Sequence, residues 1–495
     1  MTTTDLESLR DRVAGDEPIL LIEAPAGHGK TEEGVVAAQR AAQCLPHGRE
    51  ILFLTHTNSA RETFNRRLGR SAAVMKTIHS LAAEIVELYA TPLGLPRPLQ
   101  PYHAEPTFDD MMRHATDLLK RRPEVARGLA VRHPLILVDE YQDCTEDQHA
   151  LVQLVAAAGP ARLRLFGDHL QGIFDFTGAQ VNWEKLSAAH PTMSLTTPWR
   201  WKDNPGMASF LVEARAALLA GEAIDLRSPP SCVTVHRWDG PVPGPKQEGH
   251  APACLEILKS CCDDGTVVIT HHNTHALGLR RKLPGRGSYH EGSDHEPART
   301  ILEEVVAAQG NAPALAALLI QAMHEWGTGM TKPYREQVTE ICQPDGVVTG
   351  TKQKILGLAR LCERLYENPT TSEWLSCLRK VLDGEHGVDS WRVLRSDPIY
   401  LLTRLYPGTQ DDPVALLHGE ARARDAARKA PKNGFMTIHK AKGLEFDTVA
   451  IPYCAGTLFE DDLPSRCRMY VAISRAQSHL HLLVPNGDPT PLLLI

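Results

Sequence analysis

The stretch of sequence that most constrains the fold is residues 19–34, where an apolar run is followed by a glycine-containing turn and Gly-Lys-Thr at 29–31. Ile19–Glu23 predicts a strand, and the two glycines of the turn allow backbone N–H groups to be exposed. A helix that starts at the lysine then offers its N-terminus to a phosphate. The usual pattern has glycine five residues before Gly29, where this chain has Ala24. A chance glycine-rich turn is the alternative interpretation.

The positions of this loop predict the parts of a nucleotide site. Lys30 can reach the outer phosphates, and the hydroxyl of Thr31 can bind Mg²⁺. Two acids, Glu32 and Glu33, follow at the start of a helix that should attract anions. The residues expected to contact the nucleotide through this loop are Ala26, Gly27, His28, Gly29, Lys30 and Thr31.

A second element strengthens this interpretation. "LILVDEYQD", residues 135–143, is an apolar strand that ends in an Asp-Glu pair. The carboxyl edge of a parallel sheet is where such a fold presents its ligands. Asp139 would hold Mg²⁺, and Glu140 would orient and deprotonate the attacking water. A solvated acidic turn would explain the two acids by themselves but not their occurrence together with a Lys-Thr loop. The pair of elements therefore predicts nucleotide hydrolysis.

The chain alternates between short apolar strands and helical stretches, which is typical of parallel α/β sheets. Prolines between 92 and 106, and a Leu- and Ala-rich stretch from about 286 to 430, predict two helical inserts. The predicted strands are Ile19–Glu23, Glu50–Thr55, Leu135–Asp139, Leu163–Phe166, Val233–Trp238, Thr266–Thr270, Phe435–His439, Thr448–Pro452 and Leu480–Val484, with helices at Thr31–Cys44, Asn58–Leu68 and Phe108–Leu119. We therefore predict a first lobe at 1–84 and 134–205, a small helical insert at 85–133, a second lobe at 206–285 and 431–495, and a mainly helical insert at 286–430.

Composition adds weaker constraints. The chain has 53 Lys and Arg residues against 60 Asp and Glu residues, a net charge of −7, so its overall charge does not indicate nucleic-acid binding. One local basic groove could still bind DNA. The N-terminus lacks the order of a signal peptide, and no apolar run is long enough to span a membrane, so we expect a cytoplasmic protein without membrane contact. The 11 cysteines form no CxxC pair, which favours buried free thiols in a reducing compartment.

The loop and "VDEYQD" together resemble the ATPase core of superfamily 1 helicases of the UvrD/Rep type. Further stretches resemble motifs of that family in the family's order: "FLTHTNSARETF" (53–64), "KTIHSLA" (76–82), "RLFGDHLQGIFDFTGA" (164–179), "TTPWRWKDN" (196–204), "FMTIHKAKGLEFDTV" (435–449) and "SRCRMYVAISRA" (465–476). The matches extend from residue 19 to about 485. This resemblance implies a P-loop NTPase with two RecA-like parallel-sheet lobes, each interrupted by a helical insert, and ATP with Mg²⁺ between the lobes. That architecture agrees with the one predicted from the strand–helix alternation.

The resemblance also implies roles for individual residues. Gln171 would sense the γ-phosphate, Arg200 and Arg475 would be arginine fingers, and Trp199 would lie against the base. The remaining implied nucleotide contacts are Gly443 and Glu445, and the implied single-stranded DNA contacts are Thr55, His56, Asn58, Thr77, His79, Phe176, Thr437 and His439. His56 stands where the family usually has Phe, and a polar loop histidine is the alternative. Phe176 is expected to stack a base, with a core position as its alternative.

Two features depart from the family pattern. The family carries a glutamine about twenty residues before the loop that reads adenine, and residues 1–18 contain no Gln. The family also commonly has Arg just after the loop threonine, where this chain has Glu32. Base recognition would then depend mostly on stacking against Trp199, which discriminates bases poorly. We therefore expect other nucleoside triphosphates to be used beside ATP.

The function predicted is a nucleic-acid-dependent ATPase that translocates along single-stranded DNA, with the 3′→5′ direction implied by the resemblance. Because both inserts are small, unwinding of a tailed duplex is less firmly expected than translocation. The alternative is an ATP-driven nucleic-acid sensor or regulatory subunit that controls a separate nuclease. The length and layout resemble the helicase subunit of Gabija-type anti-phage systems, and DNA repair is a further possible role. A small-molecule kinase would not need "IHKAKGLEF".

One histidine-rich stretch and one cysteine cluster raise the question of a metal. "HHNTHA", residues 271–276, follows a strand and is expected to be the turn from that strand into a helix rather than a zinc site. Cys254, Cys261 and Cys262 lie close together but lack the spacing of a zinc or iron–sulfur motif. The sequence therefore predicts no metal other than Mg²⁺.

Overall fold

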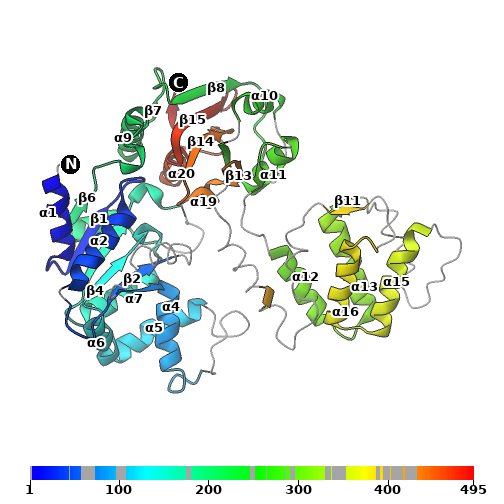
Figure 1. Cartoon of the computed structure of the whole chain (residues 1–495), viewed down its shortest axis with the longest axis horizontal. Coiled ribbons are helices and arrows are strands. Elements are labelled where there is room, and N and C mark those ends of the chain that lie inside the picture. Colours follow the sequence, from blue (N-terminus) through cyan, green and yellow to red (C-terminus); the bar gives the residue numbers. More distant parts are fainter. Residues whose placement is uncertain are drawn as a thin grey trace. The chain divides into compact units, whose positions relative to one another are not determined.

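In the computed structural model, the chain forms two compact units, Met1–Glu291 with Ala430–Ile495 and Gly292–Lys429 (Figure 1). The described residues are 3–43, 45–56, 73–95, 108–173, 180–245, 251–262, 265–283, 285–289, 296–328, 336, 353–385, 391–393, 402, 416–417 and 432–495. The predicted helix at Asn58–Leu68 and the predicted contacts Asn58 and Phe176 lie outside these residues. No helix among the described residues is long and apolar enough to cross a membrane.

The first lobe is built on a six-stranded parallel sheet with the order β3-β2-β4-β5-β1-β6. Its strands are β1 (Ile19–Glu23), β2 (Ile51–Thr55), β3 (Ala73–Thr77), β4 (Leu135–Val138), β5 (Arg162–Gly167) and β6 (Thr192–Ser194). Its helices are α1 (Thr3–Ala14), α2 (Lys30–Gln43), α4 (Ile78–Leu88), α5 (Phe108–Arg121), α6 (Pro123–Arg132), α7 (Glu146–Ala157) and α8 (Trp183–Ala189), with short 3₁₀ turns η1 (Tyr141–Asp143) and η2 (His169–Gln171).

Alternating side chains of this sheet enter two separate cores. Leu52 and Leu54 of β2 pack with α4, α5, α6 and α7 on one face. Ile51 and Phe53 of the same strand pack with α1 and α2 on the other face. Strands buried on both faces are the reason that the sequence shows continuous apolar runs rather than alternation. The predicted insert at 85–133 contributes α5 and α6 to the first of these cores.

The second lobe carries another six-stranded parallel sheet, in the order β10-β13-β9-β14-β15-β8. Its strands are β8 (Val233–Trp238), β9 (Thr266–Thr270), β10 (Ser288–Tyr289), β13 (Gly434–Thr437), β14 (Phe446–Ile451) and β15 (Ala476–Pro485). The helices are α9 (Pro205–Ala220), α10 (Pro252–Cys261), α11 (Asn273–Lys282), α19 (Ile438–Ala441) and α20 (Leu463–Ile473), with the turn η4 (Trp199–Trp201) and a pair formed by β7 (Ile224–Asp225) and β16 (Leu493–Leu494). The two parallel sheets confirm the predicted α/β fold class.

Several predicted strand ends differ from the observed ones, and the end of β13 is the case with a clear local cause. The sequence predicted a strand at Phe435–His439, but β13 ends at Thr437 and His439 lies in α19. The cause is that the hydroxyl of Thr437 accepts a hydrogen bond from the backbone N–H of Lys440 and so caps the helix. The same tripeptide, Thr-Ile-His, follows β3, where Thr77 caps α4 in the same way. The two lobes therefore end corresponding strands with the same sequence.

The second compact unit has its own apolar core. It contains α12 (Glu296–Ala307), α13 (Ala312–Trp326), α15 (Gln353–Glu367), α16 (Thr371–Leu382) and the short strands β11 (Gly327–Thr328) and β12 (Arg392–Val393). Buried tryptophans hold these elements together: the indole N–H of Trp374 donates to Leu315 O at 3.1 Å, and that of Trp391 donates to Met323 O at 2.9 Å. Because these buried N–H groups are satisfied, the large aromatic rings can fill the core without a polar penalty.

Candidate nucleotide-binding and hydrolysis site

The loop between β1 and α2 has the backbone that a phosphate-binding loop requires. Gly27 and Gly29 have φ values of 71° and 83°, and a Cβ on Gly27 would lie 2.6 Å from the ring of Trp201. A Cβ on Gly29 would lie 3.0 Å from the ring of Trp199. Both positions therefore need glycine for conformation and for space. Ala24, which replaces the glycine of the usual pattern, is fully buried in the core beside α2.

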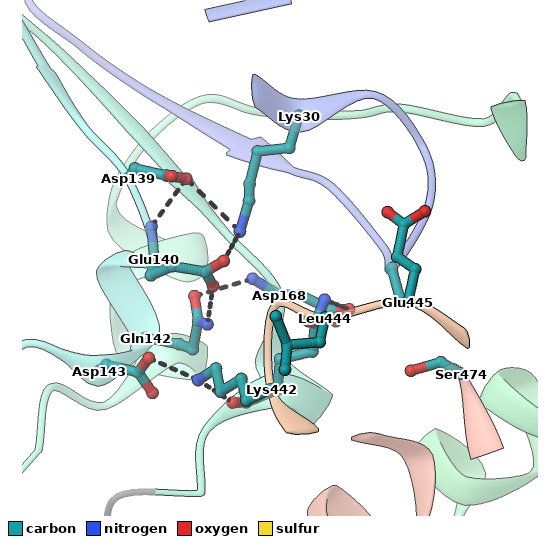
Figure 2. A network of polar contacts seen from close by, with 12 residues as sticks. Lys30, Asp139, Glu140, Gln142, Asp143, Asp168, Lys442, Leu444, Glu445 and Ser474 are labelled. Carbon is teal, nitrogen blue, oxygen red and sulfur yellow. Dashed lines mark hydrogen bonds and ion pairs between the residues drawn. The ribbon is translucent and has the colours of Figure 1, made fainter. Parts of the chain in front are cut away.

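Lys30, the first residue of α2, lies between the two predicted acids (Figure 2). Its Nζ is 3.4 Å from Asp139 Oδ1 and forms an ion pair with Glu140. Burial alone would lower the pKa of Lys30, but the charges of Asp139 and Glu140 outweigh burial and raise it. Burial would likewise raise the pKa of Glu140, and Lys30 together with Lys442 lowers it instead. The lysine is therefore charged and Glu140 is ionised over the physiological range.

Glu140 has an unusual backbone. Its φ and ψ are 52° and 44°, and it is the one non-glycine residue with positive φ in the described part of the chain. Such a conformation costs free energy and is typical of functional sites. The side chain is held by Gln142, whose Nε2 donates to Glu140 Oε2 at 2.6 Å, while Gln142 Oε1 accepts from the backbone N–H of Asp168 at 3.1 Å. Gln142 thus connects the predicted base to the start of η2 (Figure 2).

Lys442 of the second lobe reaches directly into this acidic edge of the first lobe. Its Nζ donates to Asp143 Oδ2 at 2.5 Å and to the carbonyl of Gln171 at 2.6 Å. Burial raises the pKa of Asp143 to about 6, against the opposing effect of Lys442. Lys442 follows α19, the helix that contains His439, so one side chain connects η1, the turn directly after the predicted acids, with a predicted DNA-contacting element.

The predicted γ-phosphate sensor, Gln171, is buried at the end of η2. Its side-chain amide donates to Asp168 Oδ2 at 2.8 Å. Asp168 also accepts a hydrogen bond from Arg215 at 3.0 Å, and Arg215 reaches Glu23 at 2.5 Å. Arg215 comes from α9, so this is a second ion-pair connection between the lobes. The burial of Arg215 would lower its pKa, and Asp168 raises it.

The segment from Trp199 to Asn204 fastens the first lobe to the second. The backbone N–H of Arg200 donates to Gly27 O at 3.0 Å, while its guanidinium donates to Ser474 O at 2.8 Å and to Glu445 at 2.6 Å. The indole of Trp201 donates to Ala476 O at 2.7 Å. Arg200 and Glu445, both predicted nucleotide contacts, are therefore brought together with the glycine loop.

Arg475, the second predicted finger, is buried and bonded within the second lobe. Its guanidinium donates to Val471 O at 2.9 Å, Leu444 O at 3.2 Å and the hydroxyl of Ser474 at 2.8 Å. Burial and the nearby charge of Arg200 lower the pKa of Arg475. Arg475 and the other predicted finger, Arg200, both donate to Ser474, so the two guanidinium groups lie close together.

Tyr470 is a site residue that the sequence did not single out. It lies in α20, and its hydroxyl accepts a hydrogen bond from the backbone N–H of Ala26 at 3.3 Å. The neighbouring His28 uses Nδ1 to contact Ala26 O at 2.8 Å, and burial lowers its pKa. The spacing of motifs did not predict the contacts of Tyr470, Arg215 and Lys442, because each joins two different lobes. Tyr470 and Lys442 do lie within motifs that resemble those of the family.

The predicted DNA contacts lie at the ends of β2, β3 and β13. Thr55 is buried, and the half-buried His56 that follows it lies 3.4 Å from Cys144 Sγ. Burial and Lys442 lower the pKa of His56 to about 4, so its ring is neutral and planar at physiological pH. Thr77 and Thr437 cap α4 and α19, which places His79 and His439 in the first turns of those helices. His439 contacts Ile173 O at 3.0 Å. These roles stay predictions.

The side chains at this site fit ATP and Mg²⁺. Thr31 offers a hydroxyl in the first turn of α2, and Asp139 offers a carboxylate just beyond β4. Hard oxygen ligands of this kind are the ones that Mg²⁺ prefers. Burial raises the pKa of Asp139 and Lys30 opposes that rise, so a second cation would further stabilise the carboxylate.

A glycine loop with lysine at the end of β1, facing an Asp-Glu pair at the end of β4, defines a P-loop NTPase with two parallel-sheet lobes. Two family models match the chain: the UvrD/REP helicase N-terminal domain at residues 103–189 and the UvrD-like helicase C-terminal domain at residues 435–483. The chain is therefore similar to the UvrD/Rep-like superfamily 1 helicases in both matched segments, as the motifs had indicated.

Curated relatives agree with this family. The chain is 25% identical to the ATP-dependent DNA helicase UvrD2 of Mycobacterium tuberculosis over 421 residues, which cover 76% of this chain and 51% of that protein. It is 38% identical to the ATP-dependent DNA helicase Rep of Escherichia coli over 89 residues, which cover 18% of this chain and 13% of that protein. The chain thus spans about half the length of the UvrD2 relative.

Among solved structures, the chain is similar to the Pif1 helicase from Bacteroides in complex with ADP-AlF3 and ssDNA. The TM-score is 0.35 and the identity 12%, over 100% of this chain and 94% of that chain. A likeness at this level carries no inference about the site.

Proposed function

We propose that the chain is a nucleic-acid-dependent ATPase that translocates along single-stranded DNA in the 3′→5′ direction and opens tailed duplexes to a limited extent. The observation that carries the proposal is the contact of Lys442 with Asp143 and with the carbonyl of Gln171. Through it, the hydrolytic edge of the first lobe is connected to α19 of the second lobe. The direction of movement is taken from the family alone.

Chemically, the residues divide into two groups. Lys30 binds the outer phosphates, Glu140 receives a proton from the attacking water, and Gln142 keeps the Glu140 carboxylate oriented. Arg200 and Arg475 of the opposite edge stabilise negative charge that develops in the transition state. When bound, ATP with Mg²⁺ supplies the transferable phosphoryl group and its counter-charge. Because Arg200 also bonds to Gly27 and Glu445, movement of the phosphate loop would be transmitted to the second lobe.

The test measures ATP hydrolysis with and without single-stranded DNA, then translocation from fluorophores at the 3′ or 5′ end, then strand displacement on tailed duplexes. We expect stimulation by DNA and movement away from the 3′ end. Glu140→Gln, which keeps the shape of the side chain, is the control that should bind ATP and DNA without turnover. Hydrolysis that does not respond to any nucleic acid would contradict the proposal. DNA-stimulated hydrolysis without translocation would instead support a sensor that controls a separate nuclease, as in Gabija-type defence.

Nucleotide selectivity is predicted to be relaxed. Trp199 is 44% exposed and lies against Gly29, in a position to stack on a base of any identity. On α2, Glu33 is buried and paired with Arg10 of α1 through two hydrogen bonds of 2.8 and 2.9 Å, so this acid holds α1 rather than a base. We expect GTP and CTP to be hydrolysed within about ten-fold of ATP in the presence of single-stranded DNA, because stacking discriminates weakly. Turnover of ATP alone would contradict this prediction.

The Asp143–Lys442 contact predicts a pH dependence. Below pH 6, where the pKa of Asp143 lies, the carboxyl becomes protonated and the ion pair with Lys442 is lost. We therefore expect DNA-stimulated hydrolysis to fall as the pH decreases through about 6, more steeply than hydrolysis without DNA. Stability changes in the opposite direction. Because the pKa of Asp143 in the folded protein exceeds the ordinary value of 3.8, the contribution of Asp143 to the free energy of unfolding decreases as the pH rises from 3.8 to about 6.

The control for this prediction is Asp143→Asn. The variant should show low DNA stimulation at every pH and should lose the inflection near pH 6. If the inflection persisted in the Asn variant, another group would be responsible and the Asp143–Lys442 assignment would be wrong.

A further inference from the structure

Three potential metal ligands converge on one face of the second sheet, and none of them belongs to the residues assigned to the nucleotide site. His236 lies on β8, Cys261 ends α10, and His481 lies on β15 (Figure 1 shows the three elements). One ligand atom from each residue lies within 4.8 Å of the other two, and all three residues are half-buried. His236 Nε2 and His481 Nδ1 are 3.1 Å apart.

The strand register explains why the two histidines meet. β15 pairs with β8 in parallel, with His481 opposite Thr234 and Leu483 opposite His236. Because side chains two residues apart along a strand point to the same face, His236 and His481 share one face of the sheet. α10 packs against β8, the strand that carries His236. The helix ends at Cys261, which brings its thiol to the two rings.

The chemistry of this set is that of a site for a borderline metal ion. Two imidazoles and a thiolate are ligands that Zn²⁺ and related ions prefer, whereas Mg²⁺ and Ca²⁺ prefer oxygen. With Zn–N bonds of about 2.05 Å and a tetrahedral angle, two ligating nitrogens lie about 3.3 Å apart. The 3.1 Å between His236 Nε2 and His481 Nδ1 is close to that separation.

A plain alternative exists for the same geometry. A neutral imidazole can donate to another neutral imidazole at 3.1 Å, and the thiol of Cys261 could be a neighbour without a role. The exposure of Cys261, however, differs from that of the other cysteines in the described residues. Among the cysteines of the described residues, eight are buried and Cys261 is the one that is partly accessible.

We propose that His236, Cys261 and His481 bind a divalent transition-metal ion of the zinc class, which joins β8, α10 and β15. β8 is the last strand of its sheet, so the ion would fasten an edge strand to its neighbour and to the helix that covers it. His479 lies next to the site, with its Nε2 2.9 Å from the hydroxyl of Thr234 and its ring centroid 4.6 Å from that of His481. His479 therefore supports the orientation of the His481 ring.

The test uses the full chain, treated with a chelator and then dialysed with Zn²⁺ or Co²⁺ in the presence of excess Mg²⁺, which occupies oxygen-rich sites. Metal content is measured by mass spectrometry, and Co²⁺ binding by its thiolate charge-transfer absorption. We expect one tightly bound ion per chain, and a thermal transition that rises when Zn²⁺ is restored. Cys261→Ser and His236→Gln should each weaken Zn²⁺ binding by at least about ten-fold, as expected for removal of a ligand.

Cys262→Ser is the matched control, because Cys262 is the adjacent thiol and lies outside the three-residue set. It should keep the ion and the charge-transfer absorption. Equal metal content in the unaltered chain and in Cys261→Ser, or no uptake by the unaltered chain, would overturn the proposal in favour of the imidazole–imidazole hydrogen bond. ATP hydrolysis is not used as the readout, so this result is independent of the function proposed above.

Discussion

Replacement of Lys30 by alanine is expected to reduce ATP hydrolysis by on the order of 10²–10³-fold or more, because one preorganised charge at the phosphates is lost. Lys30 is also the partner of Asp139 and Glu140. Without it, the buried carboxyl of Asp139 and the half-buried carboxyl of Glu140 lie side by side with no cation on α2, and removal of one partner of a buried ion pair typically costs about 3–5 kcal/mol of stability. We expect weaker nucleotide binding, a lower thermal transition, and single-stranded DNA binding that is largely kept.

The control separates the two effects of this substitution. In Glu140→Gln the lysine remains charged and paired with Asp139. That variant should also lose hydrolysis, but it should keep nucleotide affinity and should lose less stability than Lys30→Ala. Turnover and binding are measured with single-stranded DNA present, and unfolding is followed by circular dichroism. If Lys30→Ala hydrolysed ATP at a rate within a few-fold of the unaltered chain, the phosphate-loop assignment would be wrong.

The parts of the fold that could be predicted from the sequence are those with a local signal. β8 and β9 begin and end at the predicted residues, because each is a short β-branched run bounded by turn residues. The turn after β9 leads into α11, as the sequence predicted for "HHNTHA". By contrast, β3 and β6 were not predicted as strands. β6 has only three residues, and β3 has a short apolar run, Ala73–Met75, with a single buried residue, so neither gives a strong strand signal.

The same distinction holds for the candidate site. The order glycine loop, lysine and Asp-Glu pair is contiguous in sequence, and the structure brings Lys30 to within reach of both acids. The contact of Tyr470 with Ala26 and that of Arg215 with Asp168 depend on how two lobes pack. No spacing rule predicts such contacts, because they join residues 444 and 47 positions apart that lie in different lobes. No spacing rule predicted the His236, Cys261 and His481 set either.

Replacement of Arg475 by alanine is expected to lower DNA-stimulated hydrolysis by roughly 10³-fold or more, the range in which arginine fingers act. The guanidinium is buried and bonded to Val471 O and Leu444 O. For Arg475 to act on a phosphate, some of these bonds must be exchanged for bonds to the phosphoryl oxygens. The alanine variant would also remove a donor from Leu444 O, whereas Val471 O keeps the hydroxyl of Ser474, and a buried carbonyl that loses its donor costs about 1–3 kcal/mol.

A loss of activity could therefore arise from misfolding, and an arginine of α20, the helix that precedes Arg475, serves as the control. Arg466 lies in α20, where it pairs with Asp461 and bonds to Gly221 O at 3.2 Å. Arg466→Ala should retain hydrolysis to within a few-fold. Arg475→Lys keeps a positive charge but lacks the planar fork, so it should recover stability more than turnover. If Arg475→Ala hydrolysed ATP normally with DNA present, the second lobe would not complete the site, and Arg200 alone would have to stabilise the transition state.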